Sequence, residues 1–561
     1  MGCSSSIKDA ETKDDGDRAD NERPGTYKQT NHHSQNEDED ISCRNDDHND
    51  NESHGEPRRK SMTEEEFKAV LEATKEKFQK EMRIMNGCKD YSAETVALSL
   101  HRISACLYDI HERKRRHCLG DELASLGFAE LFVKIWTSLH KLDLFAKENL
   151  QAMKCLKKLK VIAWNYSDLS GVFGKAMGCS GAINLLLTDL VNPKLDVPTL
   201  RSNEKRYLIK GTLGILHNCI RMCPENRNLY RSANAVALLN KYQSSSYPNV
   251  KCKALLCLSY IIDEQENEQL NAGPGNLQFI IGLLESALQS PSHISKNYRF
   301  SASEIVNGLN HFAIHDTNKV MIVENGALPL YVTMLQSNCT EQEQILTARG
   351  IWTLAFPPAN KHKIKNEEGC LQALTSLKLK TLNSELFSVC CGALWELQQG
   401  ERSSDADEED RNERKISLDS RAHVMISYQW DLQARVIKLR DTLREDGYKV
   451  WMNVEKMDGD IIEMADAIEK AGAVIICMSQ RYKDDPMSRS EATYACKLLK
   501  PIIPLMMEPH CIPDGWPAVL LGAIPYFNFH SDDLLATETQ KVKEKLQQYG
   551  VLQNDKGEGD V

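Results

Sequence analysis

A helical repeat runs through more than half of this 561-residue chain and restricts what it can fold into. From about residue 63 to 400, apolar residues follow the three- and four-residue spacing of helices that bury one face. Four asparagines mark the repeat, at intervals of 41, 51 and 42 residues. They are Asn226, Asn267, Asn318 and Asn360. A period a little above 40 predicts helical units that stack into a solenoid.

Each of these asparagines lies eight or nine residues before a segment that opens with Gly or Asn and continues as an apolar helix. With one earlier segment, these are residues 181–186, 234–239, 275–277, 326–328 and 369–371. The pattern indicates a short helix, a turn and a longer helix. At these turns, including Asn-Gly-Ala-Leu at 325–328, the sequence resembles the armadillo-repeat family. The resemblance implies an all-α solenoid over residues 63–400, and Thr63 with Glu66 predicts a capping box at its start.

The first six residues, Met-Gly-Cys-Ser-Ser-Ser, fit the N-myristoylation pattern, in which Gly2 is acylated once the Met is removed. Cys3 is a candidate for palmitoylation, and a second acyl chain makes membrane binding stable. An unmodified start is the alternative. Residues 1–60 are acidic and poor in aromatic residues, which predicts a disordered, lipid-anchored tether. We therefore expect the chain at the cytoplasmic face of a membrane and otherwise in the cytoplasm.

Charge and cysteine spacing exclude two other classes of function. The net charge of −11 comes mostly from residues 1–60 and from an acidic linker at 401–420, so no basic footprint indicates a nucleic-acid partner. None of the 18 cysteines has zinc-site spacing, and we expect no metal. His311 and His315, expected on one helical face, are interpreted as structural. The basic run 113–116 is a solvated helix end or, alternatively, a contact for a nucleotide on the solenoid; a protein is the other candidate solenoid ligand.

The pattern changes after the linker to strands that alternate with helices. The predicted strands are 423–427, 448–452, 473–479, 502–506 and 524–527, and the predicted helices are 431–445, 462–470, 489–499 and 531–548. Five such units imply a parallel sheet covered on both faces. Parallel sheets bind ligands beyond the carboxyl ends of their strands, where Ser427, the loop after Met452 and the segment after Ser479 are expected to gather.

This region resembles the TIR (Toll/interleukin-1 receptor) domain family. The matching motifs are 426–428 (Ile-Ser-Tyr), 447–451 (Gly-Tyr-Lys-Val-Trp), the 455–459 loop, Ser479 with Tyr482 and Glu491, and the weaker 513–516 turn. The resemblance implies a flavodoxin-like α/β domain over residues 421–549, with a disordered tail at 550–561. Armadillo-like repeats before a TIR domain resemble the animal armadillo/SAM/TIR NAD hydrolases. The 401–420 linker leaves no room for SAM domains.

The resemblance implies a catalytic role for Glu491, twelve residues after Ser479, with NAD as a substrate and no cofactor. The implied substrate-binding residues are Ser427, Tyr428, Trp451, Asp458, Gly459 and Ser479. In NAD the nicotinamide is already cationic and leaves neutral, so one carboxylate that stabilises a ribosyl oxocarbenium ion suffices. A solvated glutamate on an amphipathic helix is the alternative interpretation.

Two arginines that follow the first-strand tyrosine in the animal hydrolases are replaced here by Gln429 and Trp430. Arg481, Lys483 and Arg489 are candidates to contact the phosphates in their place. We expect a membrane-tethered signalling protein that hydrolyses NAD to nicotinamide and ADP-ribose, or its cyclic form, under control of the solenoid. The alternative is a non-enzymatic adaptor of the innate-immune type, which would bind other TIR domains through the loop at 453–462.

Overall fold

The computed structural model describes most of the helical repeat and most of the C-terminal α/β region. The described residues are 62–271, 275–296, 298–336, 338–398, 423–453, 461–509, 513–522 and 524–551. The predicted tether, linker and C-terminal tail lie outside these residues. No helix among the described residues combines the length and apolar character needed to cross a membrane.

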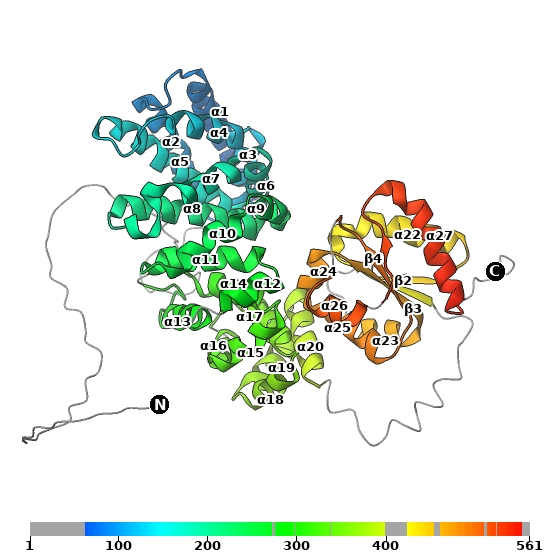
Figure 1. Cartoon of the computed structure of the whole chain (residues 1–561). Helices are drawn as coiled ribbons and strands as arrows, with labels where there is room; N and C mark the ends of the chain where they lie inside the picture. Colours follow the sequence, from blue (N-terminus) through cyan, green and yellow to red (C-terminus); the bar gives the residue numbers. More distant parts are fainter. Residues whose placement is uncertain are drawn as a thin grey trace, which may run out of the picture. The chain divides into compact units, whose positions relative to one another are not determined.

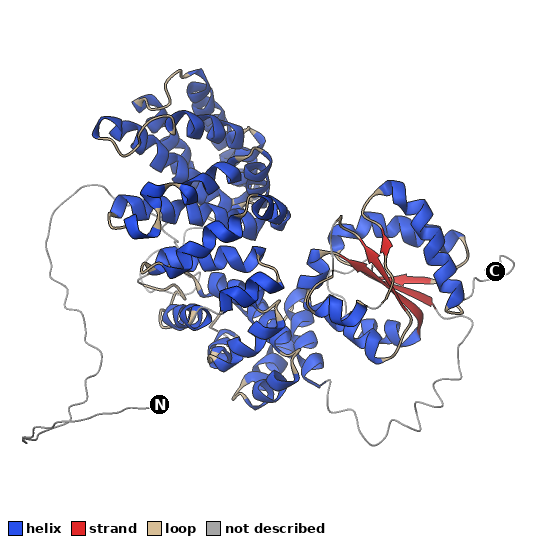
Figure 2. Cartoon of the chain, viewed as in Figure 1, coloured by secondary structure: helices blue, strands red, loops and turns tan. Residues whose placement is uncertain are grey.

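The described part before residue 399 consists of helices joined by loops and turns (Figures 1 and 2). They are α1 (Glu64–Gly87), α2 (Glu94–Ala105), α3 (His117–Ser125), α4 (Phe128–Leu139), α5 (Leu150–Leu169), α6 (Gly171–Cys179), α7 (Ala182–Val191), α8 (Asn203–Met222), α9 (Arg227–Ser232), α10 (Ala235–Asn240), α11 (Pro248–Ile261), α12 (Glu264–Asn271), α13 (Asn276–Leu288), α14 (Ala302–Phe312), α15 (Asp316–Glu324), α16 (Ala327–Met334), α17 (Glu341–Leu354), α18 (Pro358–Asn366), α19 (Cys370–Lys380) and α20 (Ser384–Gln398). Short 3₁₀ turns join some of them. The capping box predicted at Thr63 and Glu66 is confirmed at the start of α1.

From α3 onward the described helices group in threes: a short helix, a turn, a second helix and a long third helix. The third helices α5, α8, α11, α14, α17 and α20 pack against one another in order, which is the arrangement of an armadillo-like solenoid. The long third helix adds to the helix–turn–helix unit that the sequence indicated. His311 lies in α14 whereas His315 precedes α15, so the expectation that they share one helical face is wrong.

The residue before each second helix has a left-handed backbone conformation. These residues are Gly127, Gly181, Asn234, Gly275, Gly326 and Gly369, with φ between 56° and 84°. Glycine, and to a lesser degree asparagine, adopts this conformation with little strain, which explains why the turns are visible in the sequence. The five turns expected from residue 181 onward are confirmed, and the turn at Gly127 was not predicted.

The C-terminal region is a five-stranded parallel sheet in the order β2-β1-β3-β4-β5. Its elements are β1 (His423–Ser427), α22 (Gln433–Glu445), β2 (Val450–Met452), α23 (Ile461–Lys470), β3 (Ala471–Met478), α24 (Gln480–Asp484), α25 (Pro486–Lys497), β4 (Ile502–Met506), α26 (Trp516–Leu521), β5 (Phe527–Asn528) and α27 (Asp532–Gln548). The predicted bounds of the first and fourth strands are confirmed. The second strand begins at Val450, two residues later than expected, because Gly447 and Tyr448 still belong to the turn after α22.

Helices cover both faces of this sheet (Figure 1). α22 and α27 pack on one face, where Leu439 and Leu546 are buried with Val424 of β1. α23, α25 and α26 cover the other face, where Met464 and Ala492 belong to a second buried cluster. The strands are all parallel, but the order in which they are added to the sheet reverses at β1, because β2 lies on one side of β1 and β3 on the other. Ligands bind at such a switch point.

A buried asparagine joins successive units of the solenoid. The side-chain amide of Asn360 in α18 donates hydrogen bonds of 2.9 Å to the backbone oxygens of Leu354 and Lys319. Leu354 is the last residue of the preceding third helix, whose final carbonyls have no partner within the helix. Asn226 likewise donates to the backbone oxygens of Cys219 and Gly174. Asn318 donates to the backbone oxygen of Phe312 and to the side-chain oxygen of Asn267 in the preceding unit. The asparagines that reveal the repeat in the sequence therefore join units by hydrogen bonds, to backbone oxygens at Asn226 and Asn360 and between side chains at Asn267 and Asn318.

Replacing Asn360 with Ala should lower the free energy of unfolding of the helical part by about 1–3 kcal/mol, because two buried carbonyls lose their donor. Urea denaturation followed by circular dichroism measures the loss. Asn366→Ala, an exposed position on the same helix, is the matched control and should stay within ~0.5 kcal/mol of the parent chain. Equal effects of the two substitutions would contradict the structural role of the buried amide.

Candidate active site

Strand β1 places one polar side chain on the face covered by α25. Residues alternate between the two faces along a strand. Val424 and Ile426 contribute to the cluster under α22 and α27, whereas Met425 contributes to the cluster under α23 and α25. By this alternation Ser427, at the carboxyl end of β1, faces α25, the helix that carries Glu491.

Ser427 is 2% exposed and joins Glu491 to Tyr482. Its hydroxyl donates a short hydrogen bond to the Glu491 carboxylate and lies 2.6 Å from the Tyr482 hydroxyl. Because the serine proton points to the carboxylate, the Tyr482 hydroxyl donates to the serine oxygen. Burial holds the pKa of Tyr482 well above its usual value, so the phenol keeps the proton that it donates. The result is a donor chain that ends on Glu491.

Ser479 fixes the tyrosine of this chain. It is the N-cap of α24, and its hydroxyl accepts a hydrogen bond of 3.1 Å from the backbone N–H of Tyr482. Ser479 is 2% exposed and Tyr482 is fully buried. Ser479 therefore reaches the site through the position that it gives to Tyr482, and the structure brings Ser427, Ser479 and Glu491 together as the sequence predicted.

The electrostatics of Glu491 differ from those of a surface glutamate. Its side chain is partly buried. Desolvation raises the pKa of its carboxyl to about 7; the Asp485 carboxylate adds to this rise, and the Ser427 hydrogen bond opposes it. A carboxylate whose pKa lies near neutral pH is a stronger base than an ordinary glutamate. Perturbed groups of this kind cluster at functional sites.

A second polar link fixes the start of α25. Asp485 is its N-cap and accepts hydrogen bonds from the N–H and hydroxyl of Ser488, at 2.8 and 2.9 Å. The Gln429 amide donates to the Ser488 oxygen over 2.7 Å, which joins the segment after β1 to the helix that carries Glu491. Gln429, the residue after Tyr428, therefore has a structural role.

The structure separates Tyr428 from the other predicted site residues. Tyr428 follows Ser427 and packs with the cluster under α22, on the opposite face from Glu491. Its hydroxyl donates to the backbone oxygen of Asn453 over 2.6 Å, which anchors the segment after β2. Trp451 pairs with Met425 across β1 and β2 and packs on the face that α25 covers. Of the two aromatic residues, Trp451 is on the face of the candidate site.

Four predicted positions lie outside the described residues. Asp458 and Gly459 belong to the segment 454–460, and Gly2 and Cys3 belong to the N-terminal segment. Their proposed roles in substrate binding and lipidation stay predictions.

The three candidate phosphate-binding cations all pair with acidic residues, including acidic residues of the solenoid. The described residues of the solenoid and of the α/β region belong to one compact unit. Arg489 forms two hydrogen bonds with Asp316, of 2.6 and 3.1 Å. Arg481 pairs with Glu225 at 2.6 Å, whereas Lys483 lies 2.9 Å from Asp514 and 3.5 Å from Glu264. In this arrangement carboxylates pair with the three cationic side chains that the sequence suggested as phosphate contacts.

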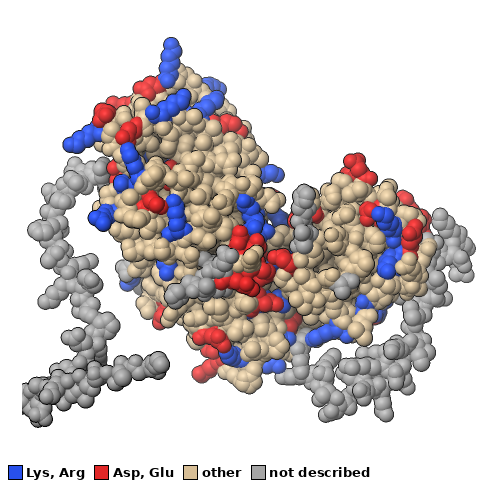
Figure 3. Space-filling view, viewed as in Figure 1, with Lys and Arg blue, Asp and Glu red and all other residues tan. Residues whose placement is uncertain are grey.

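Acidic side chains are also prominent on one face of the molecule. Figure 3 shows Asp and Glu gathered over the helical part of the drawn face, with Lys and Arg scattered. That face offers no continuous basic track for a nucleic-acid backbone. In the basic run at 113–116, Arg115 pairs with Glu112, and Arg116 donates to the backbone oxygen of Ile110.

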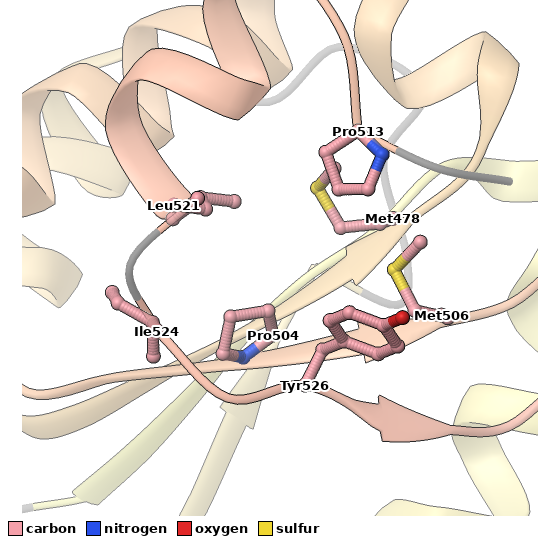
Figure 4. A pocket seen from close by; sticks show the side chains of 8 residues that line it. Met478, Pro504, Met506, Pro513, Leu521, Ile524 and Tyr526 are labelled. Carbon is pink, nitrogen blue, oxygen red and sulfur yellow. The ribbon is translucent and has the colours of Figure 1, made fainter.

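An apolar pocket lies elsewhere on the α/β domain (Figure 4). Its volume is about 190 Å³, and Met478, Met506, Leu521, Ile524 and Tyr526 contribute to its lining. The side chains in Figure 4 carry no charged group that could hold a diphosphate. The Ser427–Tyr482–Glu491 chain, which holds a carboxyl of raised pKa, is therefore the better candidate for an active site.

Sequence reasoning missed two members of the site. Tyr482 was recognised within a motif but received no role, although a tyrosine three residues after a strand-ending serine could have indicated a hydrogen-bonded turn. Asp485, which raises the pKa of Glu491, had an available signal: Asp-Pro at the start of an apolar segment is typical of an N-cap.

Comparison with known proteins identifies the C-terminal region. Residues 424–546 match the TIR domain family. No curated protein sequence matches the chain. A designed armadillo repeat protein is 18% identical over 48% of this chain and 99% of its own length, with a TM-score of 0.33. An engineered protein from the Northeast Structural Genomics Consortium is 15% identical over 88% of this chain and 93% of its own, with a TM-score of 0.39. A designed armadillo repeat protein in complex with the peptide (KR)4 is 19% identical over 48% and 98%, with a TM-score of 0.32.

The carboxyl of Glu491 should titrate with a midpoint near pH 7, well above an ordinary glutamate. Carbodiimide labels protonated carboxyls, so peptide mass spectrometry of labelled protein across a pH series reports the midpoint. Ser427→Ala should raise the midpoint because the hydrogen bond that favours the anion is lost. Asp485→Asn should lower it and still cap α25. A midpoint near 4.5 in the parent chain would contradict the described environment.

Proposed function

We propose that this TIR-domain protein is a membrane-tethered signalling protein that hydrolyses NAD to nicotinamide and ADP-ribose, or cyclic ADP-ribose, under control of its armadillo-like solenoid. The observation that carries the proposal is the partly buried Glu491 carboxylate, held by Ser427 at the switch point of a parallel sheet. TIR domains include NAD-cleaving members, which makes the reaction plausible for this fold.

The reaction requires one well-placed carboxylate. The C–N bond between ribose and the cationic nicotinamide breaks, the bonding electrons go to the nicotinamide nitrogen, and nicotinamide leaves neutral. Glu491 as an anion would stabilise the positive charge that develops on the ribose, or hold a ribose hydroxyl. Water, or a nitrogen of the adenine ring in the cyclic product, then bonds to the anomeric carbon and loses a proton to the solvent. The positive ring of NAD would itself favour the ionised form of Glu491.

Burial and hydrogen bonding suit Glu491 to this role. Desolvation strengthens its interaction with a nearby cation, and the Tyr482–Ser427 chain keeps one of its oxygens in place. The other carboxylate oxygen would face the substrate, because Ser427 is bonded to the first. Trp451, on the same face of the sheet, is the proposed contact for an aromatic ring of the dinucleotide.

Contacts between the solenoid and α24–α25 support the proposed control. Ser490, next to Glu491, is fully buried and accepts a hydrogen bond of 3.2 Å from the Trp352 indole N–H. Arg489, on the other side of Ser490, is held by Asp316 and lies over the Phe356 ring at 4.4 Å. Solenoid side chains thus bind Arg489 and Ser490, the two residues before the proposed catalytic carboxylate. In the released state, Arg481 and Arg489 would lose their solenoid partners and could contact the phosphates, whereas Lys483 would keep Asp514.

A variant that weakens the contacts between the solenoid and α24–α25 should hydrolyse NAD faster. Glu225→Lys places a cation against Arg481, and like-charge repulsion at a partly exposed pair should raise nicotinamide release roughly 3–10-fold. Full-length protein is incubated with NAD on anionic liposomes, and nicotinamide is measured by chromatography. Adding Glu491→Gln to the Glu225→Lys chain should abolish release, because the carboxylate charge is lost while the side-chain volume is kept.

The matched control is Glu324→Lys. This charge reversal breaks an exposed ion pair with Lys363 inside the solenoid and leaves the contacts to α24–α25 in place. It should leave the rate unchanged. If neither the parent chain nor the Glu225→Lys chain releases nicotinamide while circular dichroism shows both folded, the adaptor function replaces the hydrolase. Concentration-dependent association of the TIR domains would then be the property to measure.

Membrane tethering through Gly2 and Cys3 completes the proposal. Two adjacent acyl chains give stable anchoring, and an acidic segment after them would be repelled by an anionic leaflet. Anchoring also raises the local concentration of TIR domains, which favours their association.

Gly2→Ala should move the chain from the membrane to the soluble fraction and abolish labelling with an alkyne-tagged myristate analogue. Cys3→Ser should keep the myristate label but weaken membrane retention, since one myristoyl chain alone binds only marginally. Fractionation of expressing cells measures membrane retention, and the alkyne-tagged myristate analogue measures acylation. Unchanged membrane retention in Gly2→Ala would overturn the anchor.

A further inference from the structure

Three side chains with metal-binding atoms meet between two units of the solenoid. They are His293, Cys339 and Glu343, and among the described residues this is the group whose ligand atoms all lie within 4.8 Å of one another. His293 belongs to the connection between α13 and α14, whereas Cys339 and Glu343 lie before and within the first turn of α17. We propose that these residues form a binding site for Zn²⁺ or a similar borderline divalent metal ion, with three protein ligands and one open position.

The imidazole and the carboxylate already face each other. His293 Nδ1 lies 2.8 Å from Glu343 Oε1, and the two side chains are 13% and 7% exposed. The pairing raises the pKa of His293, while burial opposes the rise. The connection that carries His293 is fixed by backbone bonds: its N–H donates to Ser290, and its carbonyl accepts from Ala302, at 2.9 and 2.8 Å.

The second oxygen of Glu343 is held by the helix start. Glu343 Oε2 accepts hydrogen bonds from the backbone N–H and the hydroxyl of Thr340, at 2.8 and 2.9 Å. This capping box leaves Oε1 as the ligand atom, oriented toward His293. A carboxylate that is fixed by its second oxygen corresponds to the supporting hydrogen bonds found around metal ligands.

Cys339 supplies the third ligand. Its thiol is partly buried and donates a weak bond of 3.4 Å to the Thr333 carbonyl. Burial raises the pKa of the thiol to about 12, and the Glu343 carboxylate adds to the rise. Ligand atoms around tetrahedral zinc lie about 3.3–3.7 Å apart, so the thiol must move by about an ångström toward the pair. Cys339 lies between α16 and α17, where a side-chain rotation disturbs neither helix.

The donor set and its proton balance identify the class of metal. Thiolate, imidazole and carboxylate together suit zinc, whereas Mg²⁺ and Ca²⁺ prefer oxygen ligands alone. Binding requires a neutral imidazole and a thiolate, so the thiol of Cys339 loses its proton to the solvent. The affinity should therefore fall steeply as the pH drops.

Metal binding would join two units of the solenoid. The ligands come from the connection between α13 and α14 in one unit and from the start of α17 and the connection before it in the next. The ion would therefore bind the folded solenoid and stabilise it by mass action. This inference does not depend on NAD hydrolysis, because the site lies in the solenoid and its occupancy can be measured without any enzymatic assay.

Cobalt substitution tests the site directly. Full-length protein without a polyhistidine tag is titrated with Co²⁺ in reducing buffer. One equivalent should produce a near-ultraviolet thiolate-to-cobalt band and the intense visible bands of tetrahedral cobalt, and Zn²⁺ should displace it. Zn²⁺ should also raise the midpoint of thermal unfolding.

Ligand variants distinguish this site from other cysteines. Cys339→Ser should abolish the thiolate band, and His293→Asn, which tolerates the left-handed backbone there, should weaken metal binding about 100-fold or more. Glu343→Gln should weaken binding and keep the capping box. Cys179→Ser, at an exposed free cysteine, is the matched control and should leave the spectrum unchanged. Absence of a thiolate band in the parent chain, or a band that survives Cys339→Ser, would overturn the proposal.

Discussion

The need to pair buried backbone carbonyls at helix ends organises this protein. Asn360 meets that need by donating to Leu354 and to Lys319 of the preceding unit, which fixes the spacing of the units. The ammonium group of Lys319 is in turn bonded to Asp316, and Asp316 holds Arg489 beside the proposed catalytic carboxylate. The register of the solenoid thus determines where its acidic side chains meet the TIR domain.

Within the TIR domain, strand alternation decides which side chains can act together. Ser427 faces α25 and Tyr428 faces α22, so two adjacent residues take different roles. The first orients Glu491, and the second anchors the segment after β2. The candidate site is consequently narrow: one carboxylate, one serine and one buried tyrosine, with Trp451 on the same face. A reaction that needs one carboxylate and no proton donor fits such a site.

The sequence predicted the fold better than the site. Left-handed glycines and buried asparagines have no good substitutes, so the turns and repeats are visible directly. Ser427 and the segment after Ser479 were expected together because parallel strands present their carboxyl ends at one edge, whereas Glu491 was expected from the TIR resemblance. Tyr428 was placed at the site because its motif was considered without the period of the strand. The group around His293 was not visible in the sequence because His293 lies 46 and 50 positions before Cys339 and Glu343, and the three residues form no known motif.

Competition for cations gives the proposed regulation a definite physical form. Under the proposed function, the phosphates of NAD and the carboxylates of the solenoid compete for Arg481 and Arg489. Such competition is reciprocal by thermodynamic linkage. If the docked solenoid lowers the affinity for NAD by some factor, bound NAD lowers the affinity of the TIR domain for the solenoid by the same factor. Substrate abundance would then promote release, and any ligand that stiffens or shifts the solenoid acids would change the same equilibrium. The solenoid and the substrate therefore act on one electrostatic element, the cations that flank Glu491.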